Sequence, residues 1–294
     1  MRMRQAFAVG LVSLAPALTG CLTHIRTVAK TRPAEVVIGA SLDQLLKQVD
    51  TRFNEVQSLN AAVEIVASEG GARQGQIKEF TPFSGYIFLR KPEDLRVLLR
   101  LPVLGSQALD MVSDGKTWKL WSPPKKLAMT GTGEVTDASQ HGLESLRPKV
   151  IFDSLLVRGL GPDQVVDLTQ DSRVLPDPKD KKQLIEEPDY ELTILEPPQG
   201  NIAHTLRVIH IGRSTLLPYQ QDIYDANGHV VTQAFYSNYQ YFGDIPFPMK
   251  IQIKRPQDQY GLSITITKLT VNQKLDDDQF EVKFPEGVPV KVMK

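Results

Sequence analysis

The sequence predicts an α+β fold: a curved, half-open antiparallel β-barrel with helices covering or plugging its concave side. Three observations lead to this prediction. Strand-like runs follow one another from residue 61 almost to the end of the chain. Two tight-turn signals, Asp114-Gly115 and Asn227-Gly228, join neighbouring runs as hairpins. One amphipathic helix precedes the first run, and a long antiparallel sheet curls to create a concave face for it.

The predicted helix begins at Ser41, which fits a capping box with Gln44. Apolar residues recur at helical spacing as far as Leu59, so one face of this helix has to pack against the sheet. A second, short helix is predicted over residues 150–157. Residues 176–189 are rich in proline and charge, which predicts a solvated loop. The predicted strands span residues 61–67, 85–90, 95–101, 107–113, 117–121, 126–129, 190–195, 206–211, 220–225, 230–241, 248–254 and 262–271.

The composition is that of a globular protein and gives no support for nucleic-acid binding, an internal disulfide or a cysteine-based zinc cluster. The chain has 294 residues, of which 41% are hydrophobic and 23% charged, as in an ordinary globular protein. Its formal net charge is zero, so there is no electrostatic case for binding nucleic acid. The single cysteine excludes an internal disulfide and a cysteine-based zinc cluster.

The N-terminus predicts a signal peptide over residues 1–20. Arg2 and Arg4 precede an uncharged apolar run at residues 6–17, which is too short to span a bilayer. The sequence Leu18-Thr19-Gly20-Cys21 follows and resembles the lipobox of bacterial lipoproteins. That resemblance implies cleavage before Cys21 and acylation of this residue, with acyl chains such as palmitate. The alternative is an ordinary signal peptide with a chance cysteine.

The resemblance also implies a location. Leu22 stands where an aspartate would resemble an inner-membrane retention signal, so we expect the periplasmic face of the outer membrane. Two or more acyl chains anchor a protein stably. Residues 21–40 are then a tether with a reach of roughly 25 Å, and residues 41–294 form the folded domain.

Several predicted strands keep one apolar face. Leu95, Val97 and Leu99 alternate with other residues, and Phe235 and Tyr239 share a face of a later strand. We predict that Val97, Leu99, Phe235 and Tyr239 line a cavity on the concave side. The alternative is a core that these side chains fill, as in many small barrels.

Four segments carry a family resemblance: the helix and strand at residues 42–66, Phe88-Leu89-Arg90-Lys91-Pro92 with Leu95-Arg96-Val97, the segment Val112 to Trp118 with Pro123, and the stretch from Ile245-Pro246 to Pro285. They resemble the LolA/LolB family, which sorts lipoproteins to the outer membrane. The resemblance covers roughly residues 41–287. It implies a cavity that binds lipid or the acyl chains of a lipoprotein, and a soluble periplasmic carrier as a partner.

Within that family the lipobox is similar to LolB. The segment Leu101-Pro102-Val103-Leu104-Gly105-Ser106 resembles LolB's projecting loop, which implies membrane contact through Val103 and Leu104. The alternative for Leu104 is a side chain folded back onto the sheet. The chain departs from LolB in its greater length, which includes the segment at 176–189.

Two functions are therefore weighed. The first is a membrane-anchored protein that binds lipid or acyl chains in lipoprotein sorting or lipid transfer. The second is an anchored envelope scaffold that binds a protein partner through residues 176–189, without lipid transfer. An enzyme is not expected, because no glycine-rich phosphate loop or Gly-x-Ser-x-Gly motif is present. The five histidines show no metal-ligand spacing, so neither a metal nor a cofactor is predicted, and His204 and His210 are interpreted as structural or exposed.

Overall fold

The computed structural model describes residues 26–132, 146–177, 179–180, 182–198 and 200–293. These residues form two compact units, residues 26–33 with 174–186 and residues 34–173 with 187–293. The α-helices are α2 (Leu42–Glu55) and α3 (Pro148–Leu155), and the 3-10 helices are η2 (Pro123–Lys125) and η3 (Asp277–Phe280). The strands are β1 (Thr31–Pro33), β2 (Ser58–Gly71), β3 (Gln76–Glu79), β4 (Phe83–Arg90), β5 (Asp94–Arg100), β6 (Gln107–Ser113), β7 (Thr117–Ser122), β8 (Leu127–Thr132), β9 (Val165–Pro176), β10 (Leu184–Leu195), β11 (Thr205–Gly212), β12 (Leu217–Tyr224), β13 (Val230–Phe242), β14 (Ile245–Arg255), β15 (Tyr260–Val271) and β16 (Val290–Met293).

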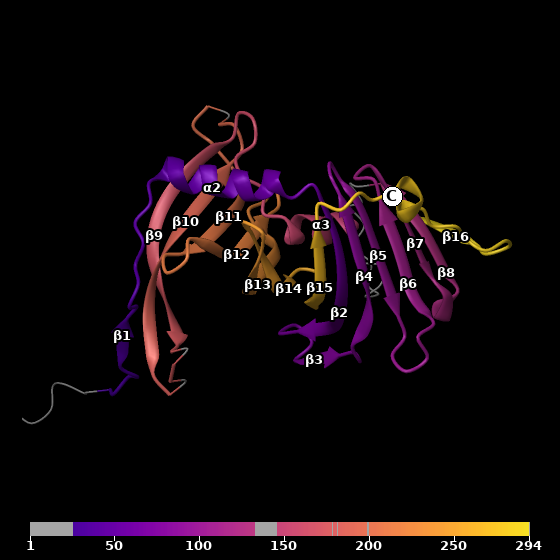
Figure 1. Cartoon of the computed structure of the whole chain (residues 1–294), viewed down its shortest axis with the longest axis horizontal. Helices are drawn as coiled ribbons and strands as arrows, with labels where there is room; N and C mark the ends of the chain where they lie inside the picture. Colours follow the sequence, from indigo (N-terminus) through magenta and orange to yellow (C-terminus); the bar gives the residue numbers. More distant parts are fainter. Residues whose placement is uncertain (1–25, 133–145, 178, 181, 199, 294) are drawn as a thin grey trace, which may run out of the picture. The chain divides into compact units, whose positions relative to one another are not determined.

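The predicted fold class is confirmed. Within the described residues, 16 strands form one sheet in the order β1-β10-β11-β12-β13-β14-β15-β2-β4-β5-β6-β7-β8-β16, with β3 beside β2 and β9 beside β10 (Figure 1). Most neighbours are antiparallel, and β1–β10 and β8–β16 are parallel. The two ends of this order do not pair with each other in the part of the chain described, so the sheet is unclosed.

The sheet of the larger unit curves around α3. This helix contacts both β6 and β14, which are five strand positions apart. Five positions in a flat sheet would span about 24 Å. A helix of 8 residues is only about 12 Å long, so the sheet has to bend for both strands to reach it. We call the side that carries α2 and α3 the helix-covered face.

Helix α2 forms as predicted, and both hydrogen bonds of the capping box between Ser41 and Gln44 are present. Its buried residues Leu45 and Val49 belong to a core cluster. That cluster also contains Tyr190, Leu192, Ile194, Ile209, Ile211 and Leu216 from β10, β11 and the turn after β11.

The segment at 176–189 is not the loop that the sequence predicted. Strand β9 runs to Pro176 and β10 begins at Leu184, so only residues 177–183 connect them. In the smaller unit, Arg32 pairs with the buried Asp177, and β1 pairs with β10 from Thr31↔Leu184 onward. The charged residues therefore belong to a hairpin, and the predicted tether contains a short strand.

The Asp114-Gly115 hairpin generates a stability prediction. Asp114 Oδ1 accepts hydrogen bonds from the amides of Lys116 (2.8 Å) and Thr117 (2.6 Å). These bonds lower the pKa of the Asp114 carboxyl below its usual 3.8. As pH falls, the unfolded carboxyl takes up a proton before the folded one, so this stabilisation is lost in acid.

We expect Asp114→Asn to lower the free energy of unfolding at about pH 6, and the difference from the natural protein to shrink only as the pH falls below about 4, through the lowered pKa of the folded carboxyl. Urea denaturation across this range measures it. Asp278→Asn, at an exposed position, is the control and should show no such trend. A difference that stays constant into acid would contradict the assignment.

Candidate functional site

The helix-covered face is filled with apolar side chains. Ile151, Phe152 and Leu155 of α3, with Leu156 beyond it, are each no more than 4% exposed. They belong to one core cluster with residues of β2, β4–β8 and β13–β15. Val97 is 1% exposed and lies in this cluster. Leu99 and Tyr239 are partly buried and pack against it.

A small apolar cavity of about 50 Å³ remains beside α3. Its lining comes from the last turns of α2, the end of α3, the residues after it, and strands β13 and β14. Tyr236 and Tyr239 both line it, but their hydroxyls differ. The Tyr239 hydroxyl donates to the carbonyl of Pro218 at 2.7 Å. The Tyr236 hydroxyl is buried and has no hydrogen-bond partner among the described residues.

The Tyr236 hydroxyl is a neutral donor at any physiological pH. Complete burial raises its pKa well above 10, because an apolar environment disfavours the phenolate. A buried donor without an acceptor costs about 1–3 kcal/mol. The hydroxyl of Ser154 in α3 is likewise buried and unpartnered within the described chain. The packing of α3 on the sheet therefore leaves two buried hydroxyls without hydrogen-bond partners among the described residues.

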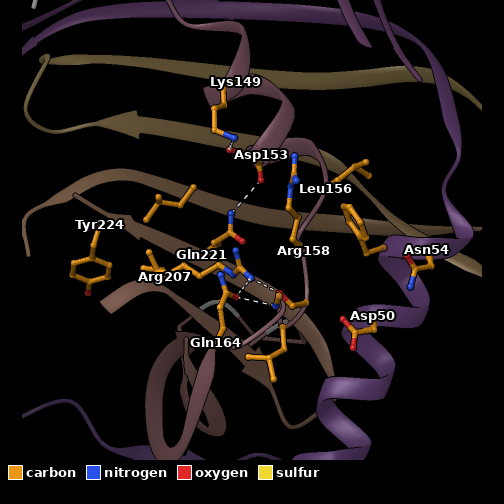
Figure 2. Close-up of a pocket in the computed structure, with 16 residues that line it drawn as sticks. Asp50, Asn54, Lys149, Asp153, Leu156, Arg158, Gln164, Arg207, Gln221 and Tyr224 are labelled. Atoms are coloured by element: carbon orange, nitrogen blue, oxygen red, sulfur yellow. Dashed lines mark hydrogen bonds and ion pairs between the residues drawn. The ribbon is translucent and has the colours of Figure 1, made fainter. Parts of the chain in front are cut away.

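A polar cleft of about 650 Å³ also borders α3. In Figure 2, Asp50 and Asn54 come from α2, Lys149 and Asp153 from α3, and Arg207 and Gln221 from β11 and β12. This volume falls within the range of small-molecule sites. The remaining lining residues are Phe53, Leu156, Arg158, Gly159, Leu160, Gly161, Gln164, Leu206, Ile223 and Tyr224.

Hydrogen bonds fix the cationic groups of this cleft. Arg207 donates to the carbonyl of Gly159, and its Nη2 lies 3.5 Å from Gln164 Oε1. Gln221 Nε2 donates to the carbonyl of Asp153 at 3.1 Å. Arg158 bridges Asp153 at 3.3 Å and Glu93 at 3.2 Å. The segment after α3 is thus held to the sheet by polar contacts.

The cleft is weakly cationic. Lys149, Arg158 and Arg207 stand against two carboxylates, Asp50 and Asp153. Burial lowers the pKa of Arg207, opposed by the charge of Asp153. Its Nε is buried without a partner in the described part of the chain, as is that of Arg158. These donors suit an anionic or carbonyl-bearing group.

The cleft and the apolar cavity adjoin, because Phe53 and Leu156 line both. A polar compartment beside an apolar one matches the two ends of an amphiphile. Sequence patterns did not predict the polar compartment. Its one signal was Arg207, a charge inside the apolar run Leu206 to Ile211.

The loop between β5 and β6 exposes its apolar side chains. Val103 is 104% exposed and Leu104 78% exposed, relative to reference side chains. Hydrogen bonds from Leu101 N to Ser106 O (2.8 Å) and from Gly105 N to Leu101 O (3.0 Å) define the loop. Leu104 is therefore not folded back onto the sheet, and its predicted membrane contact stays a prediction.

The structure places Phe235 away from the predicted cavity. Its neighbours in β13, Ala234 and Tyr236, belong to the core cluster of the helix-covered face. Side chains alternate along a strand, so Phe235 lies on the opposite face. There the ammonium of Lys254 lies 4.9 Å from the centre of its ring. The sequence showed the alternation but not which residues faced the core.

The predicted anchor, Cys21, and the predicted signal peptide lie outside the described residues. Among the helices described, none has the length and apolar character needed to cross a bilayer.

Comparison with known proteins finds one family model and several solved structures that are similar to this chain. A family model with the description "Uncharacterized protein" matches residues 176–284. No curated protein matches the chain. Among solved structures, a LolA superfamily protein from Nitrosomonas europaea is 12% identical, with a TM-score of 0.48, covering 81% of this chain and 97% of that one. A DUF1329 family protein from Desulfovibrio piger is 16% identical, with a TM-score of 0.47, covering 81% and 94%. The finer resemblance to LolB stays a prediction.

Proposed function

We propose that this protein is a membrane-anchored lipoprotein that binds the acyl chains of a lipid or lipoprotein, in lipoprotein sorting or lipid transfer. One observation carries the proposal. A large apolar sheet face is covered at its centre by one helix of 8 residues, directly beside a polar cleft. Acyl chains would take the place of α3, and the polar head would occupy the part of the cleft that α2, β11 and β12 line.

The burial energy that holds α3 on the sheet is similar to the burial energy of an acyl chain that would replace it. The apolar cavity of about 50 Å³ is too small for an acyl chain while α3 is in place. Four buried apolar side chains hold α3 with roughly 6–12 kcal/mol, at roughly 1.5–3 kcal/mol each. About 14 buried methylenes contribute roughly 11 kcal/mol. Since the two terms have the same size, an acyl chain can displace α3 and can also leave again.

The unpartnered hydroxyls favour the same exchange. Ser154 and Tyr236 each weaken the closed arrangement, because their hydroxyls are buried without an acceptor in the described chain. Tyr236 lines the apolar cavity, which adjoins the cleft at Phe53 and Leu156. A lipid carbonyl or carboxylate arriving there would accept its hydrogen bond.

The proposed location follows from the N-terminal sequence. Acylated Cys21 would hold the domain at the periplasmic face of the outer membrane, and a soluble periplasmic carrier would deliver its cargo. Val103 and Leu104 would touch the bilayer during transfer, since both are exposed. One inserted leucine contributes roughly 1.5–3 kcal/mol, so this contact is brief beside the permanent anchor.

The second candidate is an anchored scaffold that binds a protein partner and no lipid. The filled state of the helix-covered face favours it. Its contact would be the hairpin turn at 177–183, which the sequence analysis placed within the segment at 176–189.

Native mass spectrometry of the full chain, extracted in mild detergent, separates the two functions. A bound lipid in addition to the covalent anchor supports acyl-chain binding. Saturable uptake of a fluorescent fatty acid by the same preparation is the second expected result. A lipid-free chain that shows no uptake and co-purifies with a defined protein would reject the proposal in favour of the scaffold.

The two cavity tyrosines give a matched pair of variants. We expect Tyr236→Phe to leave the lipid-free protein as stable as before or more stable, because it removes an unpartnered hydroxyl. Fatty-acid affinity should fall about 2- to 10-fold, the value of one hydrogen bond. Tyr239→Phe should instead lower stability by about 1 kcal/mol, because it breaks the bond to Pro218. Fluorescence titration and urea denaturation measure both effects. If the two variants lose the same affinity, the assignment to Tyr236 is wrong.

The exposed loop between β5 and β6 gives one member of a second pair of variants. Leu104→Ser should slow lipid transfer from the full chain to vesicles by about 10- to 100-fold, the value of one inserted leucine. Stability should not change, because Leu104 is 78% exposed. Ile77→Ser alters another exposed aliphatic side chain, 67% exposed, on β3 and should leave the rate unchanged. Equal slowing by both variants would argue against a specific contact at Leu104.

A further inference from the structure

The opposite face of β10 to β12 carries a cluster of ionisable side chains that the proposed function does not use. Asp189 and Glu191 are two residues apart on β10 and therefore share a face. His210 of β11 is the direct cross-strand partner of Glu191. Ligand atoms of these three side chains all lie within 4.8 Å of one another.

The hydrogen bonds of His210 fix which ring nitrogen carries a proton. Nε2 lies 3.3 Å from Asp222 Oδ2. Asp222 is only 7% exposed and also accepts from the amides of Gln220 and Gln233. Because an ionised carboxylate only accepts hydrogen bonds, Nε2 has to be the donor. A carboxylate holding the far nitrogen is the usual support of a metal-binding histidine.

The other nitrogen then faces a second carboxylate. Nδ1 lies 3.0 Å from Glu191 Oε1. With the proton on Nε2, Nδ1 and the carboxylate oxygen face each other, so either a second proton or a metal ion lies between them. Two ligands that are each about 2.1 Å from a zinc ion lie roughly 3–3.5 Å apart. The observed 3.0 Å lies at the lower end of this range.

Asp189 supplies a third donor atom. It is 2% exposed, and its Oδ1 is buried with no hydrogen-bond partner in the described chain. Its Oδ2 accepts from the hydroxyl of Tyr219. Tyr219 is the extra residue where the β11–β12 register shifts after His210, and such bulges re-aim side chains. The Asp189 carboxylate is thus held in place with one oxygen left for a ligand.

The cluster has an excess of negative charge that a divalent cation would offset. The nearby Arg173 is already paired with Glu187, at 2.6 Å. Asp189, Glu191 and Asp222 together carry three negative charges when ionised. A proton on His210 leaves a net charge of −2, whereas a divalent ion with neutral His210 leaves −1. The side chain of Glu191 is 30% exposed, so an ion can reach the cluster from solvent.

We propose that Asp189, Glu191 and His210 Nδ1 bind a divalent transition-metal ion of the zinc type. Imidazole with carboxylates suits zinc, whereas calcium and magnesium prefer oxygen ligands alone. Asp222 positions His210 through Nε2. The ion joins β10 to β11 on the face away from α2, and its role is to stabilise the sheet.

The test uses the full chain in detergent, stripped with EDTA and titrated with zinc in a calorimeter. We expect one equivalent to bind, with a rise in melting temperature. Glu191→Gln and Asp189→Asn should each weaken binding by more than about a hundredfold, and Asp222→Asn by about 10- to 100-fold. Both glutamine and asparagine preserve side-chain shape, and circular dichroism checks the fold of each variant.

An exposed His–Asp pair serves as the matched control. His229 Nδ1 lies 3.4 Å from Asp225 Oδ2 in the β12–β13 turn, and His229→Gln should leave zinc binding unchanged. Cobalt substitution should give visible absorption bands in the natural protein that Glu191→Gln removes. The proposal fails if zinc does not bind saturably, because a proton then bridges His210 and Glu191. It also fails if Glu191→Gln and Asp189→Asn bind zinc as the natural protein does.

Discussion

The larger unit depends on keeping the inner surface of a bent sheet away from water. A long antiparallel sheet twists, and in this unit it bends until β6 and β14 both reach α3. The bend gathers apolar residues from both halves of the sheet into one core, and the only α-helices among the described residues, α2 and α3, cover it. The covering is minimal, so the same surface can serve as a core and, under our proposal, as a binding face.

The two helices differ in how firmly they are held. Helix α2 has 14 residues and a complete capping box, and it packs on its own cluster over β10 and β11. Helix α3 has 8 residues, no side-chain cap at Arg147, and two unpartnered hydroxyls at its interface in the described chain. Motion under ligand binding is therefore expected at α3, whereas α2 stays in place.

Local signals predicted much of the fold. Ser41 with Gln44 marked the start of α2, and Asp114-Gly115 marked the β6–β7 hairpin, because capping and turn chemistry act over a few residues. The high charge of residues 176–189 predicted a loop, and this prediction was wrong. Asp177 pairs with Arg32 and β10 pairs with β1, so the polar segment is part of a hairpin. The predicted position of Phe235 on the concave side was wrong for a related reason. Tertiary packing decides which residues of a strand face the core.

The functional groups were harder to predict than the strands. The polar cleft joins residues of α2, α3, β11 and β12 that are far apart in sequence. The ligand set of Asp189, Glu191 and His210 needs the β10–β11 register, which places Glu191 opposite His210. The spacing of histidines along the chain does not reveal this cross-strand register. His210 was therefore interpreted from the sequence as structural or exposed.

The pairing of β2 with β15 has a consequence for how the chain reaches its native state. These strands lie side by side at the middle of the sheet, yet Ala61 pairs with Leu269, and 207 of the 294 residues lie between these two positions. Contacts of such high sequence separation form late, because the loop between them has to close first. During synthesis, β2 therefore lacks its partner β15 until the last strands of the chain are made. The unpaired edge of β2 is exposed to aggregation during that delay.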